Sequence, residues 1–316
     1  GVHCGLKRDG KKDIALLVSD RPCVAAGVFT TNQVKAAPVR YDQAILARPG
    51  AQVRAVIANT GSANACTGEE GMGAARDMAA EAARIMGCAP QEIFVCSTGK
   101  IGPQLPLTKI VAGISKLFDE ALCTNVQQTA EAMMTTDTRP KVSVAEFSID
   151  GKAVKIVGFA KGAGMIEPNM ATMLSYITTD AAVEREALQR LLKQAVDASF
   201  NRISVDGDQS TNDTVLALAN GAADNAPLNE ASGDWPLFAK EFSRVCFELA
   251  MMIVHDGEGA DKFVTVNVSG AESDEAADLA ARSLGGGAEL PVSIFTVAAG
   301  VPVLVVLLCR RRREGT

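Results

Sequence analysis

The sequence predicts an α+β protein built from stacked layers, in contrast to a strict βαβ barrel. Runs typical of strands come in clusters, and long segments of helical periodicity separate these clusters. The chain of 316 residues is 47% hydrophobic and 22% charged, which is typical of a globular protein and excludes global disorder. Its length corresponds to one large or two modest domains.

Each predicted strand is a short run in which apolar residues alternate or follow one another. The predicted strands are Ile14–Ser19, Val24–Thr30, Val53–Asn59, Glu92–Ser97, Val142–Ile149, Ala153–Phe159, Met173–Thr178, Thr214–Asn220 and Phe263–Val268.

The predicted helices carry apolar residues at helical spacing, most clearly in Glu184–Ser199. Gly87 suits the C′ position that closes one helix, and Pro106 suits the first turn of the next. The predicted helices are Ala74–Met86, Pro106–Leu122, Glu184–Ser199, Trp235–Val254 and Ser273–Leu284.

The charge balance and the cysteines indicate where the protein works. Lys and Arg number 31 against 37 Asp and Glu, a net charge of -6, which argues against nucleic acid and against a basic membrane-surface protein. The eight cysteines include no C-x-x-C pair, and no signal peptide opens the sequence. We therefore expect a cytoplasmic protein in a reducing compartment.

Several familiar kinds of catalytic site are excluded by the residues present. The chain has two histidines, His3 and His255, and it lacks the G-x-S-x-G and P-loop motifs. Gly162-Ala163-Gly164 begins like a dinucleotide fingerprint, but the sixth position is Glu167. The segment 206–212 departs from a calcium loop at two key positions, so we interpret it as a turn-rich loop and expect no metal site.

Four polar, glycine-rich segments are unusual for loops that only connect elements. Small hydroxyls and glycines at strand ends expose backbone N–H groups, which an oxyanion hole requires. Ordinary turn chemistry is the alternative, and composition alone favours it. The segments are 59–68 (Asn-Thr-Gly-Ser-Ala-Asn-Ala-Cys-Thr-Gly), 96–102 (Cys-Ser-Thr-Gly-Lys-Ile-Gly), 134–138 (Met-Thr-Thr-Asp-Thr) and 161–172 (Lys-Gly-Ala-Gly-Met-Ile-Glu-Pro-Asn-Met-Ala-Thr).

The last of these segments, with the Met-Leu that follows it, resembles the self-cleavage site of the ornithine acetyltransferase (glutamate N-acetyltransferase) family. The other three segments resemble the same family, as do residues 1–5, 204–213 and 255–259. The resemblance runs from about Gly1 to Leu284. It implies a layered α/β/β/α sandwich of the type found in self-processing enzymes with an N-terminal nucleophile.

The resemblance also implies that the chain cuts itself between Ala171 and Thr172. Residues 1–171 would form an alpha fragment, and residues 172–284 a beta fragment that lacks the end of the family pattern. Thr172 would then carry a nucleophilic hydroxyl and its own α-amine. Because an α-amine has a pKa of roughly 8, it can act as a base near neutral pH without a histidine.

The family's functional residues match further positions of this sequence. Thr98 and Gly99 match the pair that stabilises the oxyanion. The substrate contacts match Thr135, with Thr136 and Thr138 as adjacent candidates, and Lys161, Thr172 and Glu258. Lys161 suits a substrate carboxylate, and Glu258 suits an ammonium group. A solvated surface charge is the alternative for either of these two residues.

The activity implied by the resemblance is transfer of an acetyl group from N2-acetylornithine to glutamate through acetyl-Thr172, in arginine biosynthesis. It needs no metal or organic cofactor, and some family members also use acetyl-CoA. The implied assembly is a heterotetramer of two alpha and two beta fragments. A related self-processing aminopeptidase and an inactive remnant without the family's C-terminal segment are the alternatives.

Residues 285–316 do not match the rest of the chain. Three glycines are followed by the uncharged stretch Leu290–Cys309 and by the cluster Arg310–Arg313. The first explanation of these residues is a tail altered by a shifted reading frame or misassembly, and the second is a buried strand at Val301–Leu308. A membrane anchor is third, because its length fits a span but its orientation would place the enzyme outside the cytoplasm.

Overall fold

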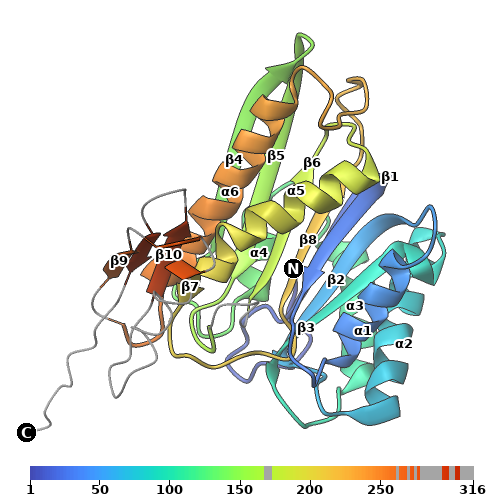
Figure 1. Cartoon of the computed structure of the whole chain (residues 1–316). Helices are drawn as coiled ribbons and strands as arrows, with labels where there is room; N and C mark the ends of the chain where they lie inside the picture. Colours follow the sequence, from blue (N-terminus) through green and yellow to red (C-terminus); the bar gives the residue numbers. More distant parts are fainter. Residues whose placement is uncertain are drawn as a thin grey trace, which may run out of the picture.

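A computed structural model describes residues 1–166, 173–260, 263–268, 271–273, 276–277, 294–298 and 303–306 of the chain (Figure 1). The strands are β1 (Ile14–Phe29), β2 (Gln52–Ser62), β3 (Ile93–Lys100), β4 (Lys141–Ile149), β5 (Lys152–Lys161), β6 (Leu174–Thr179), β7 (Ile203–Ser204), β8 (Thr214–Ala219), β9 (Val264–Val268), β10 (Ile294–Ala298) and β11 (Val303–Val306). The helices are α1 (Ala37–Leu46), α2 (Gly68–Met86), α3 (Leu107–Glu120), α4 (Val126–Met133), α5 (Arg185–Asp197) and α6 (Trp235–His255), with single 3-10 turns at Pro90–Glu92 and Phe200–Arg202.

Seven strands form one sheet in the order β3-β2-β1-β8-β6-β5-β4. The pairs β2/β3 and β6/β8 are parallel, and the other neighbours are antiparallel. Strand β1 joins the two halves of this sheet. Its first part, Ile14–Val18, pairs with β2, whereas its second part, Val24–Phe29, pairs with β8, and the register shifts between Val18 and Cys23.

The alternation of side chains along β1 shows how the halves stack. Ile14 and Leu16 pack in a core with α2 and α3, whereas Ala26, also even-numbered, packs in a core with α5 and α6. Odd-numbered Ala15 and Ala25 both lie in a third core. Because alternate strand residues point to opposite faces, the odd face of β1 borders one shared interior, while its even face meets two different pairs of helices.

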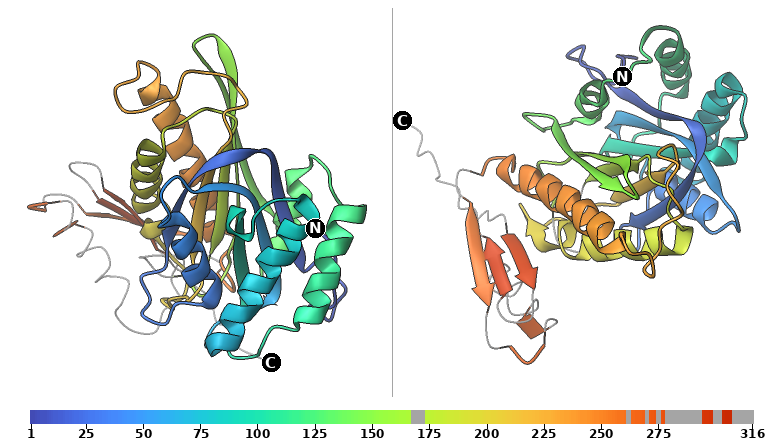
Figure 2. Two further views of the ribbon diagram at one scale, coloured as in Figure 1. Left: turned by 90° about the vertical axis from the view of Figure 1, so that its right-hand side faces the viewer. Right: turned by 90° about the horizontal axis from the view of Figure 1, so that it is seen from above.

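The third core is the layer between the two halves of the sheet. Val56 and Phe94 come from β2 and β3, and Phe159, Tyr176 and Leu216 from β5, β6 and β8. The rings of Phe159 and Tyr176 meet edge to face with centroids 5.4 Å apart. Figure 2 shows α5 and α6 on one side of the strands and α2 on the opposite side. The layers are therefore α/β/β/α, and the expected α+β sandwich is confirmed.

Helices α1 and α4 were not expected from the sequence. Helix α1 has a proline in its first turn, and α4 begins after Asn125, whose side chain accepts a hydrogen bond from Gln127 N. Both helices border the middle layer, to which they contribute Ile45 and Met133. The strands expected at Ile14–Ser19 and Val24–Thr30 are one continuous strand, β1.

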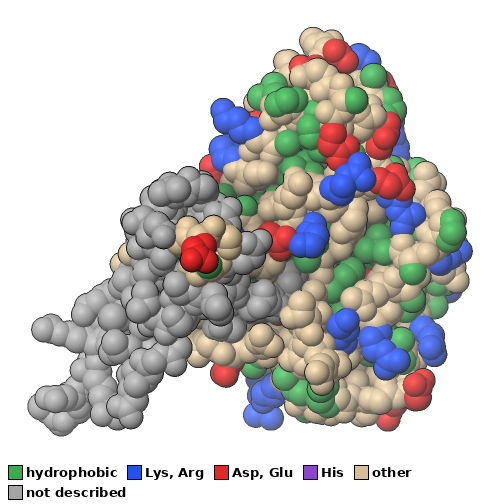
Figure 3. All heavy atoms as spheres, viewed as in Figure 1, with side chains coloured by type: hydrophobic (Ala, Val, Ile, Leu, Met, Phe, Trp, Pro, Cys, Tyr) green, Lys and Arg blue, Asp and Glu red, His purple; other side chains and the backbone are tan. Residues whose placement is uncertain are grey.

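A smaller sheet with the order β11-β9-β10-β7 lies beside α6 in Figure 1. Strand β11 lies within Val301–Leu308, the range considered as a strand in the sequence. The cluster Arg310–Arg313 and most of the helix expected at Ser273–Leu284 lie outside the described residues. Among the residues described, no helix has the length and hydrophobicity needed to cross a bilayer. Positive and negative side chains are interspersed on the face shown in Figure 3.

Asp42 of α1 is a carboxyl group buried in this fold. Its Oδ1 accepts a hydrogen bond from Val95 N at 2.8 Å, and its Oδ2 lies 3.8 Å from Cys96 Sγ. Burial raises the pKa of Asp42 well above its ordinary value. The carboxyl group of Asp42 loses its proton at a lower pH in the unfolded chain than in the folded protein. The contribution of Asp42 to stability therefore falls as pH rises between these two pKa values.

We therefore expect Asp42→Asn to reduce the loss of stability at higher pH. Asparagine keeps the oxygen that accepts from Val95 N and cannot ionise. We expect the melting temperature of the variant minus that of the wild type, measured by circular dichroism, to increase by a few degrees between about pH 5 and about pH 8. A difference in melting temperature that stays constant over this pH range would contradict the raised pKa of Asp42.

Candidate active site

One wall of the candidate site is formed where β2 and β3 end side by side. Thr98 pairs with Thr60, and Gly99 pairs with Gly61. Gly99 has φ +131°, and a Cβ at this position would lie 2.4 Å from the carbonyl carbon of Gly61. Since no side chain fits at that distance, residue 99 must be glycine for the two backbones to approach.

Buried polar side chains hold this wall in place. Asn212 Nδ2 donates to the carbonyl oxygens of Ala63 and Ser97 at 2.6 and 2.9 Å. Ser97 Oγ donates to Asn59 Oδ1 at 2.7 Å, and Asn59 Nδ2 donates to Ser62 O at 2.9 Å. Because leaving any of these buried groups unpaired would be costly, the peptides around Thr98 have a fixed orientation.

Lys161 is the last residue of β5, and its side chain is buried, with 2% of its surface exposed. Its Nζ donates to Thr98 Oγ1 at 3.3 Å. Burial lowers the pKa of Lys161, while the negative charge of Asp137 opposes this effect. The ammonium group therefore lies inside the protein beside the oxyanion candidate, and the alternative of a solvated surface charge is wrong for this residue.

The loop after α4 contains the three threonine candidates. Thr135 N donates to Asp137 Oδ2 at 2.9 Å. Thr135 and Thr136 both line the cavity described below, whereas the Thr138 hydroxyl hydrogen-bonds to Asp256.

Glu258 follows the end of α6. Its backbone N donates to Ala163 O at 2.6 Å, which ties the segment after α6 to the segment after β5. A Cβ at Gly164 would lie 2.6 Å from Glu258 Oε2, so the carboxylate lies directly against this glycine. The two segments that carry Lys161 and Glu258 are thus in contact.

These residues converge on one cavity of about 330 Å³. Five of the residues proposed from the sequence line it, and they come from four separate segments: Thr98, Gly99, Thr135, Lys161 and Glu258. The other lining residues are Ala63, Ile101, Thr136, Gly164, Met165, Asp206, Asp208, Ser210, Thr211 and Asn212. A cavity of this size with both charges in its wall suits a small charged metabolite.

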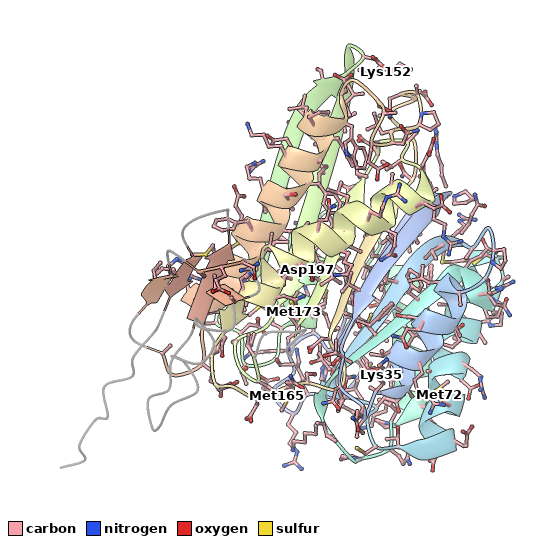
Figure 4. All side chains as sticks on the ribbon, in the orientation of Figure 1. Lys35, Met72, Lys152, Met165, Met173 and Asp197 are labelled. Atoms are coloured by element: carbon pink, nitrogen blue, oxygen red, sulfur yellow. The ribbon has the colours of Figure 1, made fainter. Side chains whose placement is uncertain are left out.

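Ala171 and Thr172 lie outside the described residues. The residue that follows them is firmly held, because Met173 N donates to Asp213 Oδ1 at 2.8 Å and Met173 O accepts from Thr214 N at 3.1 Å. Burial raises the pKa of Asp213 well above its ordinary value. Met165 and Met173 are labelled in Figure 4, toward the lower end of the strands.

Sequence reasoning did not assign the side chains that the segment 206–212 contributes to the cavity. Their signal was the polar motif at 204–213, which carried the resemblance without individual roles. It also did not identify the buried charges of Asp137, Lys141 and Asp256, because single charged residues are usually exposed. Within the part of the chain that is described, no group of three or more His, Cys, Asp and Glu side chains could hold a metal ion.

Comparisons with known proteins agree with this architecture. A family model described as the ArgJ family matches residues 1–295, which extends beyond Leu284. The arginine biosynthesis bifunctional protein ArgJ of Thermotoga neapolitana is 50% identical over 287 residues, covering 90% of this chain and 71% of its own. The protein of the same name from Bacillus subtilis is 44% identical over 295 residues, covering 93% of this chain and 72% of its own.

A solved structure gives the same assignment. The crystal structure of arginine biosynthesis bifunctional protein ArgJ from Bacillus halodurans is 40% identical, with a TM-score of 0.51, and covers 54% of this chain and 88% of its own. The match of the family model over most of the chain, together with relatives of this identity and coverage, shows that the chain belongs to the ArgJ family.

Proposed function

We propose that this protein transfers the acetyl group of N2-acetylornithine to glutamate through an acetyl-Thr172 intermediate. Membership of the ArgJ family assigns the chain to arginine biosynthesis as an acetyltransferase. The observation that carries the site assignment is the convergence of Thr98, Gly99, Lys161 and Glu258 on one small cavity.

The first step makes the nucleophile. The Thr172 hydroxyl attacks the Ala171 carbonyl carbon, the peptide C–N bond breaks, and the Thr172 amine is released as the acyl group moves to oxygen. Water then hydrolyses this ester, which leaves a carboxylate at Ala171 and a free Thr172 hydroxyl. The products are residues 1–171 and 172–316, which we propose as the alpha and beta fragments.

Two contacts support a reacting position beside the cavity. Leu174, two residues after Thr172 in the sequence, pairs with Lys161. Met173 is held from both sides by Asp213 and Thr214.

Acetyl transfer uses the same parts. The Thr172 hydroxyl attacks the acetyl carbonyl of N2-acetylornithine while its α-amine accepts the proton. The oxyanion lies against Thr98 and Gly99, and the amine of ornithine leaves with a proton. The amine of glutamate then attacks acetyl-Thr172, which restores the threonine and releases N-acetylglutamate.

The charges in the cavity suit the donor substrate. The Lys161 ammonium can bind the α-carboxylate of N2-acetylornithine, and the Glu258 carboxylate can bind its side-chain ammonium. Thr135 and Thr136 add hydroxyl groups to the same wall. Use of acetyl-CoA, assembly of two alpha with two beta fragments and a cytoplasmic location stay predictions.

Self-cleavage is tested by mass spectrometry of the purified protein. The wild type should give one fragment that ends at Ala171 and another that begins at Thr172. Thr172→Ala should remain one chain because it lacks the attacking hydroxyl. Thr172→Ser keeps a hydroxyl and should still be cut. An intact wild-type chain would overturn the proposal.

The oxyanion assignment is tested by Thr98→Val, which removes a hydroxyl with little change of shape. Loss of one such donor costs about 10²–10³ in kcat, and KM for N2-acetylornithine should change far less. Thr178→Val is the matched control, since the Thr178 hydroxyl donates to Val157 O at 3.0 Å in the body of the sheet. Equal loss in both variants would contradict the role of Thr98.

The reaction itself distinguishes the two enzymatic alternatives. Purified protein should move acetyl groups from N2-acetylornithine to glutamate, with release of ornithine and N-acetylglutamate in equal amounts. It should leave short peptides intact. Peptide hydrolysis without acetyl transfer would favour the aminopeptidase instead, and the same assay with acetyl-CoA as donor decides whether that second donor is used.

A further inference from the structure

A buried ion cluster lies beside the cavity but does not line it. Lys141, the first residue of β4, donates from Nζ to Asp137 Oδ1 at 2.7 Å and to Asp256 Oδ2 at 2.6 Å. The three side chains are at most 3% exposed. A further contact of Lys141 Nζ, to Arg139 O at 3.4 Å, leaves the ammonium surrounded by acceptors. We call these three residues the ion triad.

Both carboxylates of the triad accept further hydrogen bonds. Asp137 accepts from the backbone N of Thr135 at 2.9 Å and of Gly162 at 2.6 Å. Burial alone would raise the pKa of Asp137, but the charges of Lys161 and Lys141 and these hydrogen bonds outweigh burial and lower it. Every carboxylate oxygen of Asp137 and Asp256 therefore accepts at least one hydrogen bond.

The partners of the triad connect the segments that carry the substrate contacts. Through Gly162, Asp137 holds the backbone directly after Lys161. Asp256 holds Thr138 and lies two residues before Glu258. Because Lys141 bonds both carboxylates, it links the end of β5 to the end of α6 through a short, rigid path.

We propose that the ion triad fixes the separation of Lys161 and Glu258 and so selects the length of the donor's side chain. This inference rests on the proposed function, in which these two residues bind opposite ends of N2-acetylornithine. A donor with one more methylene group, N2-acetyllysine, then places its ammonium wrongly when its carboxylate is bound. Asp137, Lys141 and Asp256 are positioning residues, since they act through Lys161 and Glu258.

A buried ion pair contributes little net stability, because removing the two charges from water offsets much of their attraction. Its directional hydrogen bonds, however, fix the positions of the groups it joins. A pair of opposite charges at a fixed separation can discriminate between substrates by the distance between the charges at their two ends. One extra or missing methylene group in a hydrophobic pocket changes kcat/KM by about 10–200-fold, and we expect a preference of the same order here.

The test compares kcat/KM for N2-acetylornithine and N2-acetyllysine. The wild type should prefer N2-acetylornithine by about 10–200-fold. Lys141→Met, which keeps the length of the side chain but removes its charge, should lower this ratio at least about tenfold because the two ends of the site separate. Lys155→Met is the matched control: Lys155 pairs with Glu146 at 2.6 Å on the exposed surface, and its loss should leave the ratio unchanged.

Because Lys141→Met leaves two buried carboxylates without a counter-charge, a second variant guards against misfolding. Asp256→Asn keeps the shape and one accepting oxygen, and it should lower the ratio in the same direction. Circular dichroism confirms that the variants fold. An equal loss of kcat/KM for both donors, with an unchanged ratio, would overturn the inference and leave the proposed function standing.

Binding measurements separate this inference from the reaction. Calorimetric titration with ornithine and with lysine gives a ratio of Kd values that does not depend on acetyl transfer. Tighter binding of ornithine than of lysine by the wild type, and loss of this preference in Lys141→Met, would support the triad even if transfer failed. A wild type that binds neither would overturn both proposals.

Discussion

The arrangement of the whole molecule depends on one strand that belongs to two layers. Strand β1 pairs with β2 along its first part and with β8 along its second part. Its odd residues border a single interior throughout, whereas its even residues meet α2 and α3 at one end and α5 and α6 at the other. The period of two residues therefore dictates that both helical layers lie outside and that the two halves of the sheet face each other.

The site follows from this stacking. When the halves face each other, the end of β3 in one half comes close to the end of β5 in the other, which brings Thr98 within hydrogen-bond distance of Lys161. Loops from other parts of the chain then close the cavity. The buried lysine lies where the two halves of the sheet meet. Burial lowers its pKa, and the negative charge of Asp137 opposes this effect.

The sequence was most informative where the local pattern carries the information. Strong periodicity located α5, and glycine-rich ends of strands located the region of Thr98 and Gly99. The continuity of β1 could not be read in this way, because pairing partners are set by distant residues. The short helices α1 and α4 are stabilised by the middle layer into which they pack, and this tertiary effect outweighs their weak local signal.

The site residues show the same limit. Motifs named Thr135, Lys161 and Glu258, and all three line the cavity. The ion triad could not be predicted, because no local sequence pattern connects a lysine and an aspartate that lie 115 residues apart in the chain. A buried pair of this kind is visible only when the fold has brought its partners together.

The order of the strands has a consequence for the life of the protein after the proposed cut. Strands β6 and β8 come from the second fragment, yet they lie between β1 and β5 of the first. After that cut, neither polypeptide could leave without breaking the sheet on both sides. Refolding would then require two chains to meet, so its rate would depend on concentration. The proposed maturation would therefore work in one direction, because the chain would fold once as a single molecule and would refold afterwards only as a pair.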